Sequence, residues 1–243
     1  MPARVVGFAL GLAIVATHAQ APARAYDPTT AYQRRTVQGF TVLVNKNLAG
    51  HEDVADAVYL ELTTQLRAIA AAVPPVPLGK LRETRIWLEW TEAKDASVVF
   101  HPSGLWLRDH GHNPDKAGGV AIDNPVNFLE GSRGGQRGGI LNALALAYHF
   151  RMPAEEQEAV QGVYRGAMDR NLYAAVPDAG GVPKEAPARQ GPAMYFAELT
   201  KSYFDLSDYF PFTRGELGRY DPEGYRHMQQ IWGRPPARKP KKK

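Results

Sequence analysis

The stretch at residues 138–149 constrains the fold of this chain more than any other. It reads GGILNALALAYH, and its apolar residues recur at spacings of three and four, the period of one face of a helix. No acidic or basic side chain interrupts the pattern before His149. The sequence therefore predicts a helix around which the rest of the chain is organised.

Residues in and around this helix, in fixed order along the chain, resemble those of one peptidase family. Within the helix the matching residues are Leu141, Leu144, Ala145, Ala147, Tyr148 and His149. Other matching segments are residues 101–114, 124–128, 195–198, 203–204 and 208–232. Together they resemble the lethal-factor-like gluzincins, a secreted branch of the zincin metallopeptidases. The resemblance covers residues 98–233.

This resemblance implies an α+β, zincin-like fold, in which a small N-terminal lobe of strand, helix and strand precedes a mainly helical C-terminal lobe. Hydrophobic patterns in the N-terminal half predict a strand at residues 36–45, a helix at 51–72 and a strand at 85–90. Residues 120–124 are expected to form the edge strand beside the cleft. Such an edge can pair with an extended peptide, although an ordinary edge strand is the simpler interpretation.

The positions that would carry the chemistry are replaced. In the family, H-E-x-x-H supplies two zinc-binding histidines and a general base, the first glutamate of E-Y-F-A-E is the third ligand, and a tyrosine stabilises the oxyanion. The corresponding residues here are Asn142, Ala143, Leu146, Met194 and Pro187. The resemblance therefore implies no catalytic residue, no bound metal and no cofactor. We expect Leu146 and Met194 to pack together where the metal would lie.

Two ionisable residues remain near this frame. His149 lies on the same helical stripe as Leu146, and Glu198 lies one turn beyond Met194. They are candidate residual residues of the cleft. One histidine and one glutamate provide half of a tetrahedral zinc site, and a buried pair that only hydrogen-bonds needs no metal.

Two other segments have the composition of a ligand site without its spacing. His101, His110 and His112, with Asp109, lie in a segment rich in glycine and proline, where histidines usually satisfy turns or face solvent. The glycine-rich run at residues 131–139 lacks the G-x-x-x-x-G-K-[ST] pattern of a phosphate-binding loop, so we interpret it as a flexible loop.

The rest of the C-terminal half predicts scaffold. Residues 154–173 have the pattern of an amphipathic helix, and residues 177–192 are a loop, rich in proline and glycine, that covers or borders the cleft.

The two ends of the chain differ from the body in composition. Residues 1–25 resemble a secretory signal peptide, with Arg4 before an apolar run that is too short to span a membrane. Residues 26–233 form the zincin-like domain, and residues 234–243 are expected to be a disordered basic tail. The whole chain carries +4, of which +2 lies in the signal and +6 in the tail, so the body is about −4. The chain contains no cysteine, which excludes disulfides and thiolate chemistry.

We therefore expect a secreted or periplasmic, catalytically inactive metallopeptidase homologue with a binding or structural role, and a protein or peptide ligand at its cleft. The alternative is an active zinc metallopeptidase that uses rearranged ligands. A third interpretation is a carrier whose tail binds an anionic surface. The tail's cations are Arg234, Arg238, Lys239, Lys241, Lys242 and Lys243. No motif specific for nucleic acid is present.

Overall fold

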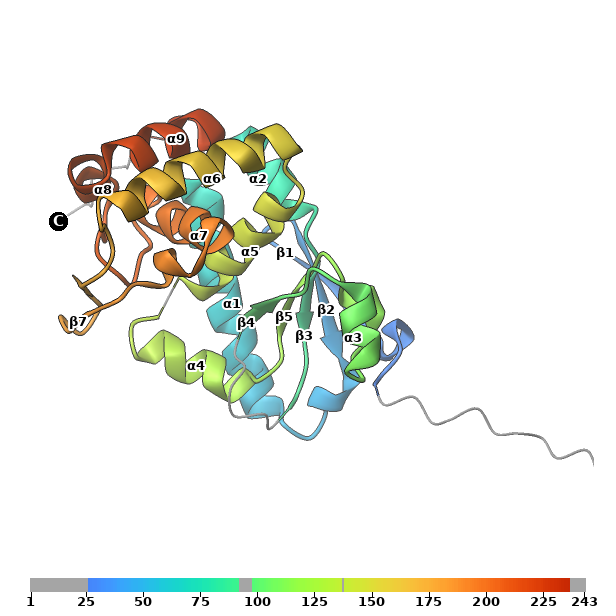
Figure 1. Cartoon of the computed structure of the whole chain (residues 1–243). Helices are drawn as coiled ribbons and strands as arrows, with labels where there is room; N and C mark the ends of the chain where they lie inside the picture. The colour runs from blue at the N-terminus through green and yellow to red at the C-terminus, as the bar shows by residue number, and fades with distance from the viewer. Residues whose placement is uncertain (1–25, 92–97, 137, 237–243) are drawn as a thin grey trace, which may run out of the picture.

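The computed structural model describes residues 26–91, 98–136 and 138–236. The predicted signal peptide, residues 1–25, and most of the predicted tail, residues 237–243, lie outside these ranges. The fold is mixed α+β, with a small N-terminal sheet followed by a helical C-terminal region (Figure 1). The predicted α+β class and the order of its two parts are confirmed.

The N-terminal region is built on a five-stranded sheet with the order β1-β2-β3-β5-β4. Its strands are β1 (Tyr32–Val37), β2 (Phe40–Asn45), β3 (Ile86–Leu88), β4 (Val98–Phe100) and β5 (Val120–Ile122). The three inner strands run parallel, while β1 and β4 pair antiparallel at the two edges. The predicted edge strand at residues 120–124 is therefore wrong. All three residues of β5 are buried between β3 and β4, and β4 is the edge strand.

The first hairpin of the sheet divides the strand that the sequence predicts at residues 36–45. Gln38 and Gly39 have φ values of 51° and 84°, and positive φ at both central residues is the signature of a tight two-residue turn between antiparallel strands. The missed strand, β1, has four exposed residues between its buried ends, Tyr32 and Val37. This edge strand has too little apolar alternation to be visible in the sequence.

Helix α1 (Glu52–Ala72) confirms the helix predicted at residues 51–72. Its two acidic residues in the first turn, Glu52 and Asp53, favour the positive end of the helix dipole. Prolines after a helix usually mark its end, yet the proline-rich segment that follows α1 begins a further helix, α2 (Pro75–Arg82). Proline is accepted in the first turn of a helix because no backbone N–H is needed there.

Short 3-10 segments complete the connections in the described part of the chain: η1 (Thr29–Ala31), η2 (Lys46–Leu48), η3 (Pro114–Lys116) and η4 (Pro187–Gln190). Helices α3 (Gly104–Asp109) and α4 (Pro125–Arg133) flank β5 in sequence. Because α4 continues to Arg133, the first part of the glycine-rich run at residues 131–139 is helical rather than a loop.

The C-terminal region consists of packed helices and a two-stranded ribbon. The helices are α5 (Gly139–Phe150), α6 (Ala154–Asp169), α7 (Pro192–Tyr203), α8 (Arg214–Tyr220) and α9 (Pro222–Trp232). The ribbon, β6 (Val176–Pro177) with β7 (Pro183–Lys184), overlaps the predicted loop at residues 177–192, and its first residue precedes that range. Helix α6 is shorter than the predicted range 154–173, since Asn171 and Tyr173 adopt positive φ. No helix in the described part of the chain is both long and apolar enough to cross a bilayer.

Helix α5 confirms the helix predicted at residues 138–149 and connects the two regions. It contacts β4 and β5 of the sheet, α1 and α2, and most extensively α7 (Figure 1). Its buried residues, among them Ile140, Leu144 and Ala145, belong to one hydrophobic core that also includes Phe40 of the sheet and Trp232 of α9. The sheet and the helical region therefore share a continuous core.

Candidate functional site

The interface between α5 and α7 holds the residues that the resemblance places at a catalytic centre. The Nδ2 of Asn142 donates a hydrogen bond of 2.7 Å to the Oε1 of Glu198 and lies 3.7 Å from the Sδ of Met194. Asn142 and Met194 come from helices 52 positions apart in the sequence, and the frame requires them to face one another. Their contact agrees with that placement.

Glu198 also belongs to a buried ionic network. The Nζ of Lys201 lies 2.9 Å from the Oε1 of Glu198 and also bonds the half-buried Asp208. Only 6% of Glu198 and 3% of Lys201 are exposed. One ammonium thus lies between two carboxylates, with the amide of Asn142 as a further donor to Glu198.

Burial and charge act in opposite directions on this network. Burial raises the pKa of Glu198 above its ordinary value, although the Lys201 ammonium and the hydrogen bond from Asn142 oppose this shift. Burial acts to lower the pKa of Lys201, but the carboxylates of Glu198 and Asp208 outweigh it and the pKa is raised. Lys201 therefore stays protonated and is the fixed cation of the interface.

These side chains do not fit a zinc ion. The amide of Asn142 presents its N–H group toward Glu198, and the opposite orientation would bring its oxygen against a carboxylate. Met194 offers a thioether, which zinc disfavours. The ammonium of Lys201 already compensates the carboxylate that a metal could use. No chemical step through a metal follows from this arrangement.

The other replaced positions contribute to packing. Ala143 is buried in the core, and Leu146 is half-buried against it. Pro187 is the first residue of η4, which packs against α7. Met194 is also half-buried, so the positions that the resemblance assigns to a metal site lie at the margin of the core rather than at its centre.

His149 and Glu198 are not brought together by a hydrogen bond. Glu198 is engaged by Asn142 and Lys201. His149 lies seven residues beyond Asn142, about 10 Å along the helix, and its ring centroid is 5.6 Å from that of Phe196. Its Nε2 has no hydrogen-bond partner among the described residues, and burial lowers the pKa of His149. A neutral imidazole in an aromatic environment is the result.

The histidine-rich segment forms an aromatic cluster around Trp106. The ring centroid of Trp106 lies 4.1 Å from that of His110 and 5.9 Å from that of His112, in stacked geometry. The Nδ1 of His110 is 2.8 Å from the carbonyl oxygen of Trp106, which closes a turn, and Asp109 is exposed. Within residues 26–91, 98–136 and 138–236, no group of three His, Cys, Asp or Glu side chains is arranged to hold a metal ion.

A second buried lysine was missed by the sequence reasoning. The Nζ of Lys116 lies 3.0 Å from the Oε2 of Glu89 and 3.0 Å from the Oδ1 of Asp123. Burial alone would raise the pKa of Asp123, but the imidazole of His101, whose Nε2 lies 3.6 Å from the Oδ2 of Asp123, and the Lys116 ammonium lower it to about 2. Glu89 and Asp123 directly follow β3 and β5, and carboxyl ends of neighbouring parallel strands meet at one sheet edge. An acidic residue directly after each of two buried strands is the sequence pattern from which this charged cluster could have been predicted.

Comparisons with family models, with curated proteins and with solved structures found no match.

Leu146→Ala is expected to destabilise the protein by about 1–3 kcal/mol, because the side chain is half-buried against the core. Leu144→Ala is the matched control on the same helix, where the leucine is fully buried, and should cost about 2–5 kcal/mol. Urea denaturation of both variants tests this order. A loss below about 0.5 kcal/mol for Leu146→Ala would show that the side chain packs against nothing.

Proposed function

We propose that this protein is a catalytically inactive homologue of the zincin peptidases that acts by binding. One observation carries the proposal. At the α5–α7 interface, one turn beyond the position at which the resemblance places a zinc ligand, the charge of Glu198 is compensated by the ammonium of Lys201, which also bonds Asp208. The carboxylate nearest to that position is thus neutralised by a side chain of the chain itself.

The network has a structural consequence that suits a binding protein. Asn142 connects α5 to Glu198 on α7, and Lys201 connects α7 to Asp208 in the segment beyond it. Buried polar networks of this kind specify one arrangement of the elements that they join. The former catalytic helix pair is held in a fixed relation without a metal.

The first expected result is the absence of zinc chemistry. Purified protein starting at residue 26 should contain no stoichiometric zinc after dialysis, and should not cleave casein in a chelator-sensitive manner. Neither Asn142 nor Met194 offers a good zinc donor, and Lys201 repels the ion. The measurements are elemental analysis and a fluorescent casein assay.

The matched variant introduces three ligands in the same frame: Asn142→His, Leu146→His and Met194→Glu. We expect it to gain zinc affinity, because imidazole and carboxylate are good zinc ligands. Stoichiometric zinc in the unmodified protein, with chelator-sensitive cleavage, would instead establish the alternative, a peptidase with rearranged ligands.

We further propose that the protein is exported and that its basic tail attaches it to anionic surfaces. The support is the predicted signal at residues 1–25 and the six cations at residues 234–243. Each cation near an anionic membrane contributes about 1 kcal/mol at low salt.

The protein should therefore bind phosphatidylserine vesicles at low salt and lose this binding at high salt, whereas a version ending at Gly233 should not bind. Vesicle sedimentation measures both. Equal binding by the two versions at low salt would show that the tail contributes nothing.

A further inference from the structure

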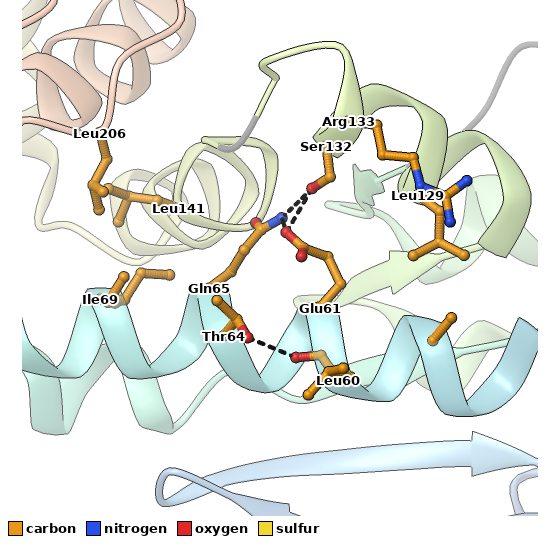
Figure 2. Close-up of a pocket in the computed structure, with 12 residues that line it drawn as sticks. Leu60, Glu61, Thr64, Gln65, Ile69, Leu129, Ser132, Arg133, Leu141 and Leu206 are labelled. Atoms are coloured by element: carbon orange, nitrogen blue, oxygen red, sulfur yellow. Dashed lines mark hydrogen bonds between the residues drawn. The ribbon is translucent and has the colours of Figure 1, made fainter.

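A groove of about 590 Å³ lies between α1, α4, α5 and the segment that follows α7, and we name it the α1 groove (Figure 2). Its walls are mainly apolar. Leu129, Leu141 and Leu206 come from three different elements, and Leu60 of α1 is 69% exposed at its margin. The volume is within the usual range of ligand pockets.

Polar groups gather at the middle of this apolar groove. The Nε2 of Gln65 donates to the Oε1 of Glu61 at 2.9 Å and to the Oγ of Ser132 at 2.8 Å, and that hydroxyl donates to the same Oε1 at 2.7 Å (Figure 2). The three side chains lie between the apolar residues of the two ends. A few convergent polar groups in an apolar cavity are typical of a ligand site.

This polar centre has spare acceptors and no spare donor. Both amide protons of Gln65 and the hydroxyl proton of Ser132 are used within the trio, and Thr64 donates to the carbonyl oxygen of Leu60. The Oε1 of Gln65 is buried and has no partner among the described residues, and the hydrogen bonds that reach Glu61 both end on its Oε1. The complementary group is therefore a hydrogen-bond donor.

The negative charge of the groove indicates that this hydrogen-bond donor is a cation. Glu61 brings a negative charge into the groove, which favours an ammonium or guanidinium and repels a carboxylate or phosphate. Arg133 belongs to the lining but is exposed, and its guanidinium is turned away from Glu61 (Figure 2). The groove itself does not supply the counter-charge.

The groove is also elongated. A second cavity of about 560 Å³ shares Ala68 and Leu206 with it and continues beside α1 as far as Ala72. From Ala57 to Ala72 the helix axis spans about 22 Å, the length of about six or seven extended residues. An extended segment matches this shape better than a compact small molecule.

We propose that the α1 groove binds an extended peptide segment of a partner protein, with a lysine or arginine between apolar residues. The cation meets Glu61 and Gln65, and the apolar side chains on either side contact Leu60 and Leu129 in one direction, Leu141 and Leu206 in the other. The chain's own tail supplies cations but, apart from alanine and proline, no apolar side chain, so it lacks half of this pattern. The inference does not depend on the loss of peptidase chemistry.

The test measures the binding of short blocked peptides to the full-length protein. In an extended peptide alternate side chains point to one side, so Leu-Ser-Lys-Ser-Leu presents two leucines and a lysine to the groove. Fluorescence polarisation of the labelled peptide should give saturable binding. Replacing its lysine by methionine should weaken binding about tenfold or more, and glutamate should abolish it, because a charge-assisted hydrogen bond is lost.

Variants of the protein distinguish binding in the groove from binding to other surfaces. Glu61→Gln keeps an oxygen acceptor for Gln65 and Ser132 and should weaken binding about tenfold. Glu158→Gln on exposed α6 makes the same change of net charge and should have no effect. Leu60→Ser, at an exposed position, should weaken binding about three- to tenfold without loss of stability.

Three outcomes would overturn the proposal. They are equal binding of the lysine and methionine peptides, equal effects of Glu61→Gln and Glu158→Gln, and displacement of the peptide by hexylamine at the concentration at which the peptide itself competes. Displacement by hexylamine would show that an amine alone is enough for binding in the groove. Thermal unfolding of each variant verifies that it is folded.

Discussion

Lys201→Met should destabilise the protein by about 3–5 kcal/mol, because removal of one partner leaves the buried carboxylate of Glu198 and the half-buried carboxylate of Asp208 without their cation. Methionine retains the length of the side chain, so little of the loss comes from packing. Urea denaturation measures the free energy of unfolding. Lys46→Met at an exposed position is the control and should stay within about 0.5 kcal/mol.

The pH dependence of this variant distinguishes charge from shape. A carboxyl group whose folded-state pKa is raised adds stability below its ordinary pKa, 4.5 for Glu198, and loses that contribution as pH rises through the folded value. Without Lys201 the pKa of Glu198 should rise further, so the deficit should be large near about pH 8 and smaller near about pH 5. A deficit that does not change with pH would mean that Lys201 acts by packing alone.

Asp221→Ala should cost about 3–5 kcal/mol, since this fully buried carboxylate organises the far end of the helical region. It accepts hydrogen bonds from the hydroxyls of Tyr195 at 2.5 Å and Tyr173 at 3.0 Å, and from Arg170 at 3.1 Å. It also accepts from the backbone N–H of Gly224 at 3.1 Å, which caps α9. Burial raises the pKa of both tyrosines, so they remain donors, and alanine would leave both phenols without their acceptor.

The matched control for Asp221 is Glu223→Ala. Glu223 is 49% exposed and pairs with the same Arg170, but an exposed ion pair contributes less than about 1 kcal/mol. Chemical denaturation should therefore separate the two variants clearly. A loss for Asp221→Ala as small as that for Glu223→Ala would show that water replaces the buried acceptor.

Elements with a strong local period could be predicted from the sequence. Helices α1 and α5 place apolar residues every three or four positions, and both were located within about one residue. Strand β1 was missed because four of its six residues are exposed, and α2 because its prolines were interpreted only as a helix stop. The interior position of β5 depends on its neighbours in the sheet, which no local pattern encodes.

The candidate site could likewise be predicted only in part. A shared frame on two helices assigned Asn142 and Met194 to one site, and the Nδ2 of Asn142 lies 3.7 Å from the Sδ of Met194. The expected packing of Leu146 against Met194 stays a prediction. The role of Lys201 was not predicted, because an exposed and a buried lysine look alike in a sequence, and Asp208 reaches it only through the fold. The groove beside α1 was missed for a related reason, as its walls come from segments more than 140 positions apart.

The continuous core through α5 limits how this molecule can move. Many clefts open by a hinge between two separately packed lobes, but a hinge needs a plane that few apolar contacts cross. Here the sheet, α1, α2 and α7 all contact the same helix, so opening one lobe from the other would expose the interior of both. The chain should melt in one cooperative transition, and a ligand held anywhere on this body should raise the melting temperature of the whole.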